Sequence, residues 1–523
     1  MTAAAPSMAG RRAWTGLAVL ALPTLLVSID FSVLFLALPK LSADLGPSSA
    51  QLLWIGDIYG FMIAGFLITM GTLGDRIGRR RLLLLGAAAF GATSVLAAFS
   101  GSAAMLIASR ALMGIAGATL MPSTLALITN MFEHPRQRAT AIGAWFSFFL
   151  AGIALGPILG GLLLQSFWWG SVFLAGVPVM VVLLLVAPRL LPEHRAEQAG
   201  RLDPTSVTLS LAGILPVVYG LKEIAQDGLQ AATVLVMLLG LAFGAAFVRR
   251  QRSLPDPLLD LRLFRNPTFS AALAVMLPGT LLPGAVSLFA AQYLQLVAGL
   301  SPLQAGLWLL PSALGTIAGA MLGPALARRM RPADVIAAGV ALASVGFLVL
   351  TQVDSGSGLA VLVAGGTIAF LGIAPTGVLA TDMVVGSAPA EQAGSASAVS
   401  ETTAELGAAL GVAIFGSVGT AIYRSQVDAA VPANTPAAAV EAARDSLAGA
   451  ASAAADLPAP LGPELLDTAR EAFTGALNLV AGVGVVAMVV FAVLALTLRR
   501  RIGPAEPTAD QEATAGLEGR PGW

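Results

Sequence analysis

The chain has 523 residues, of which 57% are apolar and only 11% are charged, against about 25% charged in ordinary soluble domains. This balance predicts an all-α integral membrane protein that crosses the bilayer many times. The formal net charge is zero, so we expect no nucleic-acid partner. The sequence contains no cysteine, which excludes disulfides, thiolate metal sites and cysteine nucleophiles, and we expect neither a metal nor an organic cofactor.

Apolar runs of about 20 residues, the length that crosses about 30 Å of hydrocarbon, predict the membrane spans. The first residues are short and polar, and we expect no cleaved signal peptide. We predict fourteen spans, at 14–38, 51–72, 82–99, 103–128, 139–164, 171–188, 204–221, 231–249, 268–290, 303–326, 334–352, 358–381, 394–422 and 473–498.

Charge in the connections predicts the orientation. Of the 29 Lys and Arg residues, 23 fall in alternate connections and the two termini, five fall in the opposite connections, and Arg110 lies within a span. Positive charge is retained on the cytoplasmic side of membrane proteins. We therefore expect a multi-pass protein of the inner (cell) membrane with both termini in the cytoplasm.

The segment GTLGDRIGRRR, Gly71–Arg81, follows the second span and combines three glycines, one acid and four arginines. Its spacing resembles the loop between helices 2 and 3 of the major facilitator superfamily. The resemblance implies that Asp75 latches the cytoplasmic side by meeting a helix N-terminus of the second half, with a solvated loop acid as the alternative. The implied gate comprises Gly71, Asp75, Arg76, Gly78, Arg79 and Arg80.

A second match lies in the fifth span, where AGIALGPILGGLL fits the pattern G-x-x-x-G-P-x-x-G-G. It resembles a motif that is typical of exporters in the superfamily. Small residues let helices touch closely and proline weakens the helical hydrogen-bond ladder, which predicts a bendable contact. Ordinary small-residue packing is the alternative. The predicted hinge comprises Gly152, Gly156, Pro157, Gly160 and Gly161.

Segment PALARRMRP after the tenth span occupies the place of Gly71–Arg81 in the second half, which indicates a degenerate repeat. The resemblance implies the major facilitator fold, with two six-helix bundles and two inserted helices. We predict an N-terminal bundle at 1–190, a two-helix insertion at 191–267, a C-terminal bundle at 268–498 and a disordered cytoplasmic tail at 499–523. The long outer connection 423–472 includes EAARDSLAGAASAAA, a possible short helix, and is either a cap or a flexible linker.

Ionisable groups within the spans carry the candidate chemistry. Asp30, Asp57, Glu401 and Glu405 face one base, Arg110, which gives three excess negative charges in a medium where each charge is costly. We expect Arg110 to pair with Asp30 or Asp57 and to take part in proton coupling, with a static ion pair as the alternative. The remaining acids must line water, hold a proton or face a cationic ligand.

Glu401 and Glu405 are four residues apart on one helix face, and the predicted spans of the second half contain no Lys or Arg. We expect these glutamates to bind a cation. Aromatic rings of the second and fifth spans offer faces on which a cation can rest, although core packing is the alternative for each. The other candidate substrate residues are Asp57, Trp54, Tyr59, Trp145 and Phe149. Trp168 and Trp169 are expected to lie in the aromatic belt at the membrane surface.

The fourteen-span pattern resembles the drug/proton antiporter branch of the superfamily. This implies a secondary transporter rather than an enzyme, which exports lipophilic cations such as quaternary ammonium compounds, dyes and biguanides in exchange for protons. The expected partners are such cations, protons and membrane lipid, and we expect a monomer. The alternatives are a proton-coupled exporter of an endogenous metabolite or of an uncharged antibiotic, and an uptake symporter.

Overall fold

The computed structural model describes residues 9–132, 134–193, 203–227, 230–254, 257, 261–388, 393–432 and 434–497. All regular secondary structure in these residues is helical, which confirms the predicted fold class. The first part contains α1 (Arg11–Leu45), α2 (Ser49–Ile77), α3 (Arg79–Ala98), α4 (Ala103–Met131), α5 (Pro135–Ser166), α6 (Ser171–Leu174), α7 (Gly176–Leu190), α8 (Pro204–Asp227) and α9 (Ala231–Ser253).

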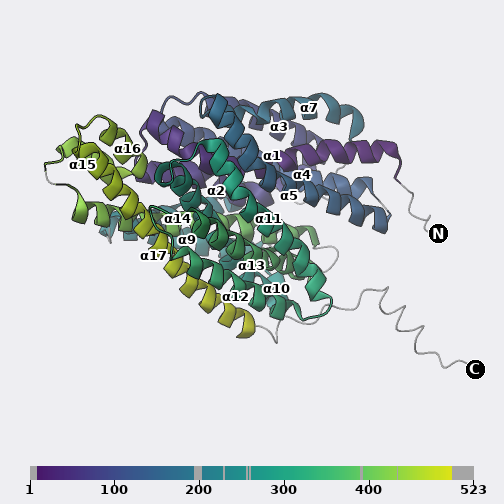
Figure 1. The fold of residues 1–523 in the computed structure, drawn as a ribbon. Helices are drawn as coiled ribbons and strands as arrows, with labels where there is room; N and C mark the ends of the chain where they lie inside the picture. Colours follow the sequence, from purple (N-terminus) through teal and green to yellow (C-terminus); the bar gives the residue numbers. More distant parts are fainter. Residues whose placement is uncertain are drawn as a thin grey trace, which may run out of the picture.

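The second part begins with a short 3-10 helix, and a π-helical turn follows its first long helix. Its elements are η1 (Leu263–Arg265), α10 (Pro267–Gln292), η2 (Tyr293–Val297), α11 (Pro302–Ala327), α12 (Pro332–Leu350), α13 (Leu359–Gly386), α14 (Ala393–Ala430), α15 (Ala437–Asp445), α16 (Leu447–Ala455) and α17 (Leu461–Thr497). Figure 1 shows α15 and α16 side by side at the end of the molecule that lies opposite the start of α1.

Thirteen stretches of the described chain are long and apolar enough to cross a membrane, and Pro204–Val217 in α8 is a shorter apolar helix. Together they match the fourteen predicted spans. Several helices begin with proline at the first helical position, where its missing N–H costs nothing. Ser48 and Ser301 each start a helix with a reciprocal capping box, to Gln51 and Gln304.

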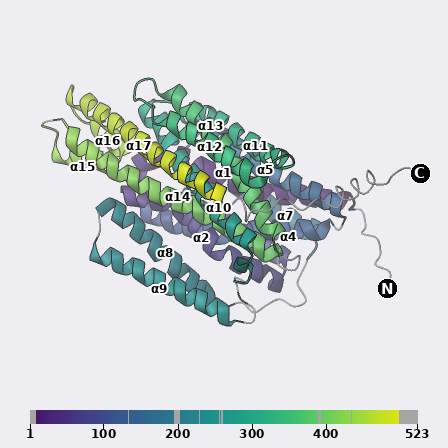
Figure 2. The same cartoon turned by 90° about the horizontal axis from the view of Figure 1, so that it is seen from below.

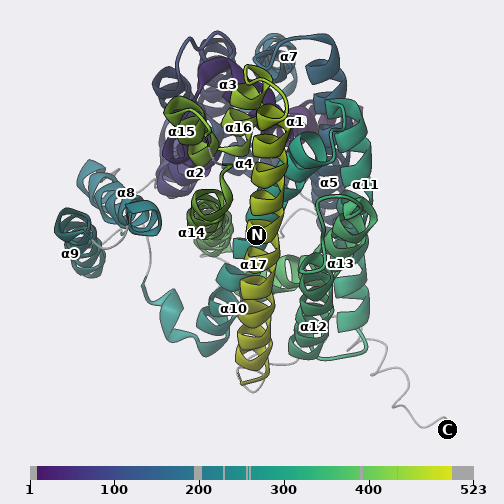
Figure 3. The ribbon, with the colours of Figure 1, turned by 60° about the vertical axis from the view of Figure 1, so that its left-hand side comes forward.

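Packing divides most helices into two groups. In the first group, α1 packs on α5 and α7, α4 packs on α2 and α3, and α3 packs on α7. In the second group, α13 packs on α11 and α12, α14 packs on α10, and α17 packs on α12 and α14. Figure 3 shows the first group above the second, with α8 and α9 beside them. The α8–α9 pair contacts the groups through α8, which touches α2 and α14.

Several predicted boundaries differ from the structure, and two of these differences change a predicted connection. Helix α2 continues to Ile77, so Gly78 alone separates it from α3 and Gly71–Ile77 are helical rather than a loop. Likewise α14 extends to Ala430 and α17 starts at Leu461, with α15 and α16 between them. In both places the helix continues beyond its apolar residues. Hydropathy shows where a helix leaves the hydrocarbon layer of the membrane, but it does not show where the helix ends.

We call the membrane side that carries α15 and α16 the cap side, and the opposite side, where α1 begins and α17 ends, the terminal side. Figure 2 shows α15 and α16 at one end of the long helices. The predicted tail at 499–523 lies outside the described residues.

Candidate functional site

A buried ion pair joins α4 to α1. Arg110 Nη1 donates to Asp30 Oδ2 at 2.7 Å, and the Arg110 and Asp30 side chains are only 1% and 8% exposed. Arg110 Nε also donates to the Ile55 carbonyl of α2 at 3.4 Å. The arginine therefore holds three helices of the first group together, and of the two predicted partners the structure pairs it with Asp30.

Tyr59 of α2 connects this pair with the second group. The Arg110 guanidinium lies 4.5 Å from the centre of the Tyr59 ring, a cation–π distance. The charges of Asp30, Arg110 and Glu405 all act on the Tyr59 phenol. Its hydroxyl is buried and has no hydrogen-bond partner among the described residues. An unpartnered buried hydroxyl is costly, so it marks a place where a partner is expected to arrive.

Glu401 and Glu405 lie on α14, one helical turn apart, and their side chains are half-buried. The neighbouring Thr402 hydroxyl is buried without a hydrogen-bond partner among the described residues. No ion pair of the described chain involves either glutamate. Helix α14, which carries both acids, packs against α2 at the contact between the two helix groups, which we call the seam.

The aromatic candidates separate into different environments. Trp54 stacks on Tyr219 of α8 at 6.5 Å between ring centres and packs with Phe61, which places it in the contact between α2 and α8. Trp145 of α5 is buried, and its indole N–H has no partner among the described residues. Phe149, one turn further along α5, is half-buried and stacks on Phe146. Asp57 is buried on α2, one turn from Trp54.

The predicted gate surrounds the α2–α3 junction. Gly78 has φ +109°, and a Cβ atom there would lie 2.6 Å from Glu193 Cδ, so this position requires glycine. Glu193 accepts from the Arg80 backbone N–H at 3.0 Å, and Arg80 donates to the Leu191 carbonyl at 2.9 Å. The Arg79 side chain lies against Gly74, while Gly71 faces open space. Arg76 is exposed, and the Asp75 side chain is outside the described part of the chain.

The predicted hinge residues of α5 face two different helices. A Cβ at Gly152 would lie 2.6 Å from the Leu25 carbonyl, and one at Gly160 would lie 2.8 Å from Val33, both on α1. On the opposite flank, a Cβ at Gly161 would lie 2.7 Å from Leu303 Cα of α11. Pro157 contacts Gly306 of α11 in the same way, and Gly156 is buried. Helix α5 thus lies between the two helix groups.

Several contacts between described residues of the two groups lie in the cap-side half. Besides α5 and α11, Leu53 of α2 contacts Gly416 of α14, and Gln295 Nε2 donates to the Leu36 carbonyl of α1 at 2.9 Å. Helix α16 packs on α17 and also touches α1. The structure therefore has its cap side closed.

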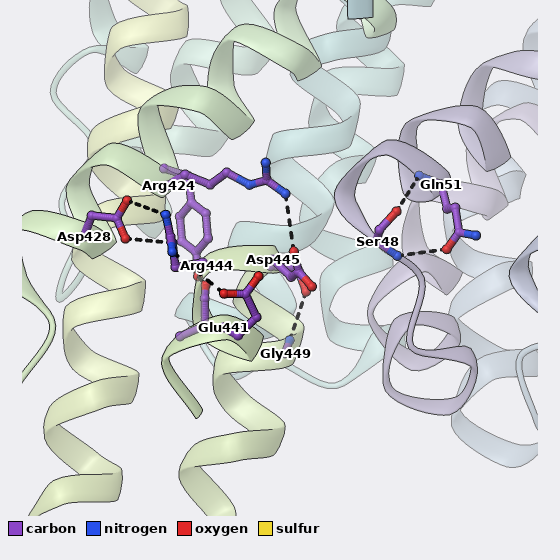
Figure 4. Close-up of polar contacts among 11 residues, drawn as sticks. Ser48, Gln51, Arg424, Asp428, Glu441, Arg444, Asp445 and Gly449 are labelled. Atoms are coloured by element: carbon purple, nitrogen blue, oxygen red, sulfur yellow. Dashed lines mark hydrogen bonds and ion pairs between the residues drawn. The ribbon is translucent and has the colours of Figure 1, made fainter. Parts of the chain in front are cut away.

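The cap itself is an ordered pair of helices, which decides between the two alternatives for 423–472 in favour of folded structure. Arg444 pairs with Asp428 at 2.8 Å, and Arg424 pairs with Asp445 at 3.3 Å (Figure 4). The Tyr423 hydroxyl donates to the Ala443 carbonyl at 2.7 Å. These contacts fix α15 onto the end of α14.

Sequence reasoning missed Glu193 and Gln295, whose partners are distant in the chain. A polar Gln295 at the end of an apolar run was a usable signal, whereas nothing in the pattern around Glu193 pointed to Gly78. The expectation for Trp169 was wrong. Its side chain is 4% exposed and donates to Asp44 at 2.6 Å, while Trp168 is exposed as predicted.

Comparison with known proteins identifies the family. The sequence profile of the Major Facilitator Superfamily matches residues 20–412. This chain belongs to the major facilitator superfamily. It is similar to the multidrug efflux pump LfrA of Mycolicibacterium smegmatis, with 47% identity over 88% of this chain and 91% of the relative. It is also 35% identical to the methyl viologen resistance protein SmvA of Salmonella typhimurium, over 88% and 93% of the two chains.

A third relative of this superfamily member is the tetracenomycin C resistance and export protein of Streptomyces glaucescens, with 33% identity over 96% of this chain and 94% of the relative. Among solved structures, a bacterial homologue of the human lysosomal transporter Spinster, in an inward-facing and unoccupied conformation, superposes with a TM-score of 0.65. That match covers 94% of this chain and 98% of the other at 17% identity, and it supports the transporter fold.

Proposed function

We propose that this superfamily member is a proton-coupled antiporter that exports lipophilic cations across the cytoplasmic membrane. The proposal is supported by the drug-export relatives and by the exporter-type motif of α5. It places both termini, and therefore the terminal side, in the cytoplasm, in line with the distribution of arginine.

One observation carries the proposal. Tyr59 lies against the Arg110–Asp30 pair with its hydroxyl unpartnered among the described residues, and the charges of that pair and of Glu405 all act on it. The acids there outnumber the single guanidinium. Ionised carboxylates without a counter-charge are expensive in a low-dielectric interior. A proton or a bound cation removes that cost, and each makes the other unnecessary.

Exchange follows from this competition. A lipophilic cation that enters from the terminal side binds Glu401 and Glu405 and favours loss of their protons. After the protein opens on the cap side, protons from outside bind the acids and release the cation. Tyr59 links this event to Arg110 and Asp30, because its free hydroxyl can donate to a carboxylate that moves toward it and its ring lies against the guanidinium.

Alternation requires the closed cap side to open. The contacts of Gly161 and Pro157 with α11 must then separate, while Gly152 and Gly160 keep α5 on α1. We propose that the α5 motif is the hinge of this movement and that Asp75 with its neighbouring arginines latches the terminal side when the cap side is open.

The test is ethidium efflux from loaded cells, with and without a protonophore. We expect Glu401→Gln to lower protonophore-sensitive efflux at least tenfold at equal protein in the membrane. Asp382→Asn is the matched control, because Asp382 is an exposed acid of the second group on α13. Efflux by E401Q equal to that of wild type, or efflux unaffected by the protonophore, would reject the proposal.

A second candidate is export of an uncharged or endogenous product, which is favoured by the tetracenomycin C relative. In that case the glutamates carry protons only. The two candidates differ in what the wild-type protein exports. Export of a neutral polyketide without efflux of ethidium would favour the second candidate.

A further inference from the structure

Helices α8 and α9 enclose a groove of about 770 Å³ that is separate from the seam. Figures 2 and 3 both show the pair standing at the side of the helix groups. The groove exists because the two helices approach through glycine: a Cβ at Gly213 would lie 3.1 Å from Gly244 Cα, and one at Gly240 would lie 2.9 Å from Val217. Side chains beside these glycines form its walls.

The groove has the dimensions of one acyl chain layer. Its α9 wall runs from Gly240 to Arg252, thirteen residues whose twelve steps span about 18 Å at 1.5 Å per residue. One leaflet occupies about 15 Å, half of the hydrocarbon thickness. Apart from its arginine end the lining is almost wholly apolar, with Ile214, Leu241 and Phe247 among its side chains.

The end of the groove on the terminal side is positively charged. Arg249 and Arg252 line it, lie three residues apart on one helix face, and are exposed. Neither forms an ion pair with an acid of the described chain, whereas the intervening Arg250 is occupied by Asp203 at 2.6 Å. Two guanidinium groups at the headgroup level, above an apolar trough, match a phosphate that is attached to acyl chains.

We propose that this groove binds one anionic phospholipid in the leaflet of the terminal side, with its phosphate on Arg249 and Arg252 and an acyl chain along Gly244. The site touches the moving parts of the protein. Ile214 lines the groove and also packs against the cluster that Phe61 of α2 and Ala413 of α14 form. A lipid that fills the groove therefore supports the α8 face that rests on both helix groups.

The chain offers variants for each half of the site. Arg249→Gln with Arg252→Gln removes the charge, and Arg328→Gln with Arg329→Gln, at exposed arginines after α11, is the matched control. Gly244→Leu fills the trough, and a Cβ there meets no atom within 4 Å, so this variant keeps the helix packing.

The experiment is native mass spectrometry of the full-length protein in detergent with equimolar phosphatidylglycerol and phosphatidylcholine. We expect wild type and R328Q/R329Q to retain one phosphatidylglycerol in preference to phosphatidylcholine. The ratio of bound phosphatidylglycerol to bound phosphatidylcholine should fall about 25-fold in R249Q/R252Q, because each arginine near an anionic headgroup contributes roughly fivefold. G244L should bind neither lipid tightly.

Equal retention of the two lipids by wild type, or an equal loss in R328Q/R329Q, would overturn the proposal. Displacement of phosphatidylglycerol by inorganic phosphate alone would show a free-anion site instead of a lipid site and would also overturn it. If G244L does not elute as wild type on size exclusion, the two arginine pairs decide the question by themselves.

Discussion

Arg110 is the largest fully buried side chain of the described residues, and it carries a positive charge. Its guanidinium is almost fully buried and is matched by one carboxylate, one backbone carbonyl and the face of Tyr59. A buried charge of this kind is stable only while its partner remains ionised. The pair therefore holds α1, α2 and α4 together.

Asp30→Asn is expected to destabilise the protein, because Arg110 then stays buried without a carboxylate. Breaking a buried pair by removing one partner costs roughly 3–5 kcal/mol. The melting temperature of D30N in detergent should fall well below that of wild type, and D30N/R110Q should recover part of the loss. Strictly additive losses in the double variant would show that the two residues are not coupled.

For single residues, the sequence identified the ionisable groups of the interior, but it predicted few of the contacts that these and other side chains make. Arg110 stood out because a base within a span needs an acid at similar depth, and Asp30 satisfies that need. Trp169 failed because its position after a span does not reveal whether the loop folds inward onto Asp44. Glu193 could not be recognised, since its role against Gly78 exists only once α3 and α7 are packed.

Among the elements, α5 links the two groups. Its Gly161 flank touches α11 so closely that any side chain there must push the helices apart on the cap side. Gly143 of the same helix faces open space and can accept a side chain without contact. A side chain at either position changes the helix propensity of α5, but only one at Gly161 is expected to open the cap side.

Gly161→Leu is expected to open the cap side, and Gly143→Leu is its control. Because the chain has no cysteine, a single Leu53→Cys, at a buried site facing Gly416, reports accessibility. Labelling of that cysteine by a membrane-impermeant maleimide should rise several-fold with G161L and not with G143L. No change with G161L would remove α5 from the cap-side closure.

The α8–α9 pair is held at its terminal-side end by Asp203, which accepts two hydrogen bonds from Arg250. Those bonds lower the pKa of Asp203 to about 2 from its ordinary 3.8. Since the folded pKa is the lower one, the pair stabilises the protein above about pH 4, and its contribution is lost as the pH falls toward 2.

Asp203→Asn should therefore lower the melting temperature slightly at pH 7, by an amount equivalent to less than about 1 kcal/mol for a partly exposed pair. The difference between D203N and wild type should shrink as the pH is lowered from 4 toward 2, measured by thermal unfolding in detergent. A difference that is constant with pH would assign the effect to packing.

For element positions, the apolar runs predicted all the long helices but not their ends. The cap helices α15 and α16 escaped because alanine-rich sequence is equally compatible with a linker, and their ion pairs to α14 are long-range. The division into 1–190, 191–267 and 268–498 stays a prediction.

At the scale of the whole molecule, the membrane interior holds more acid than base, and the excess sits where the helix groups meet. Helices α5 and α2 of the first group contact α11 and α14 of the second group on the cap side. A bound proton or a bound cation can each neutralise the excess negative charge of these buried carboxylates. On the proposed function, they compete for Glu401 and Glu405.

Proton release on cation binding tests this competition most directly. Purified protein in weakly buffered detergent solution is mixed with tetraphenylphosphonium, and the pH change is followed with an indicator dye. We predict that wild type releases protons in proportion to bound cation and that E401Q/E405Q releases none. Cation binding by wild type without proton release, or the same release from the double variant, would contradict the competition.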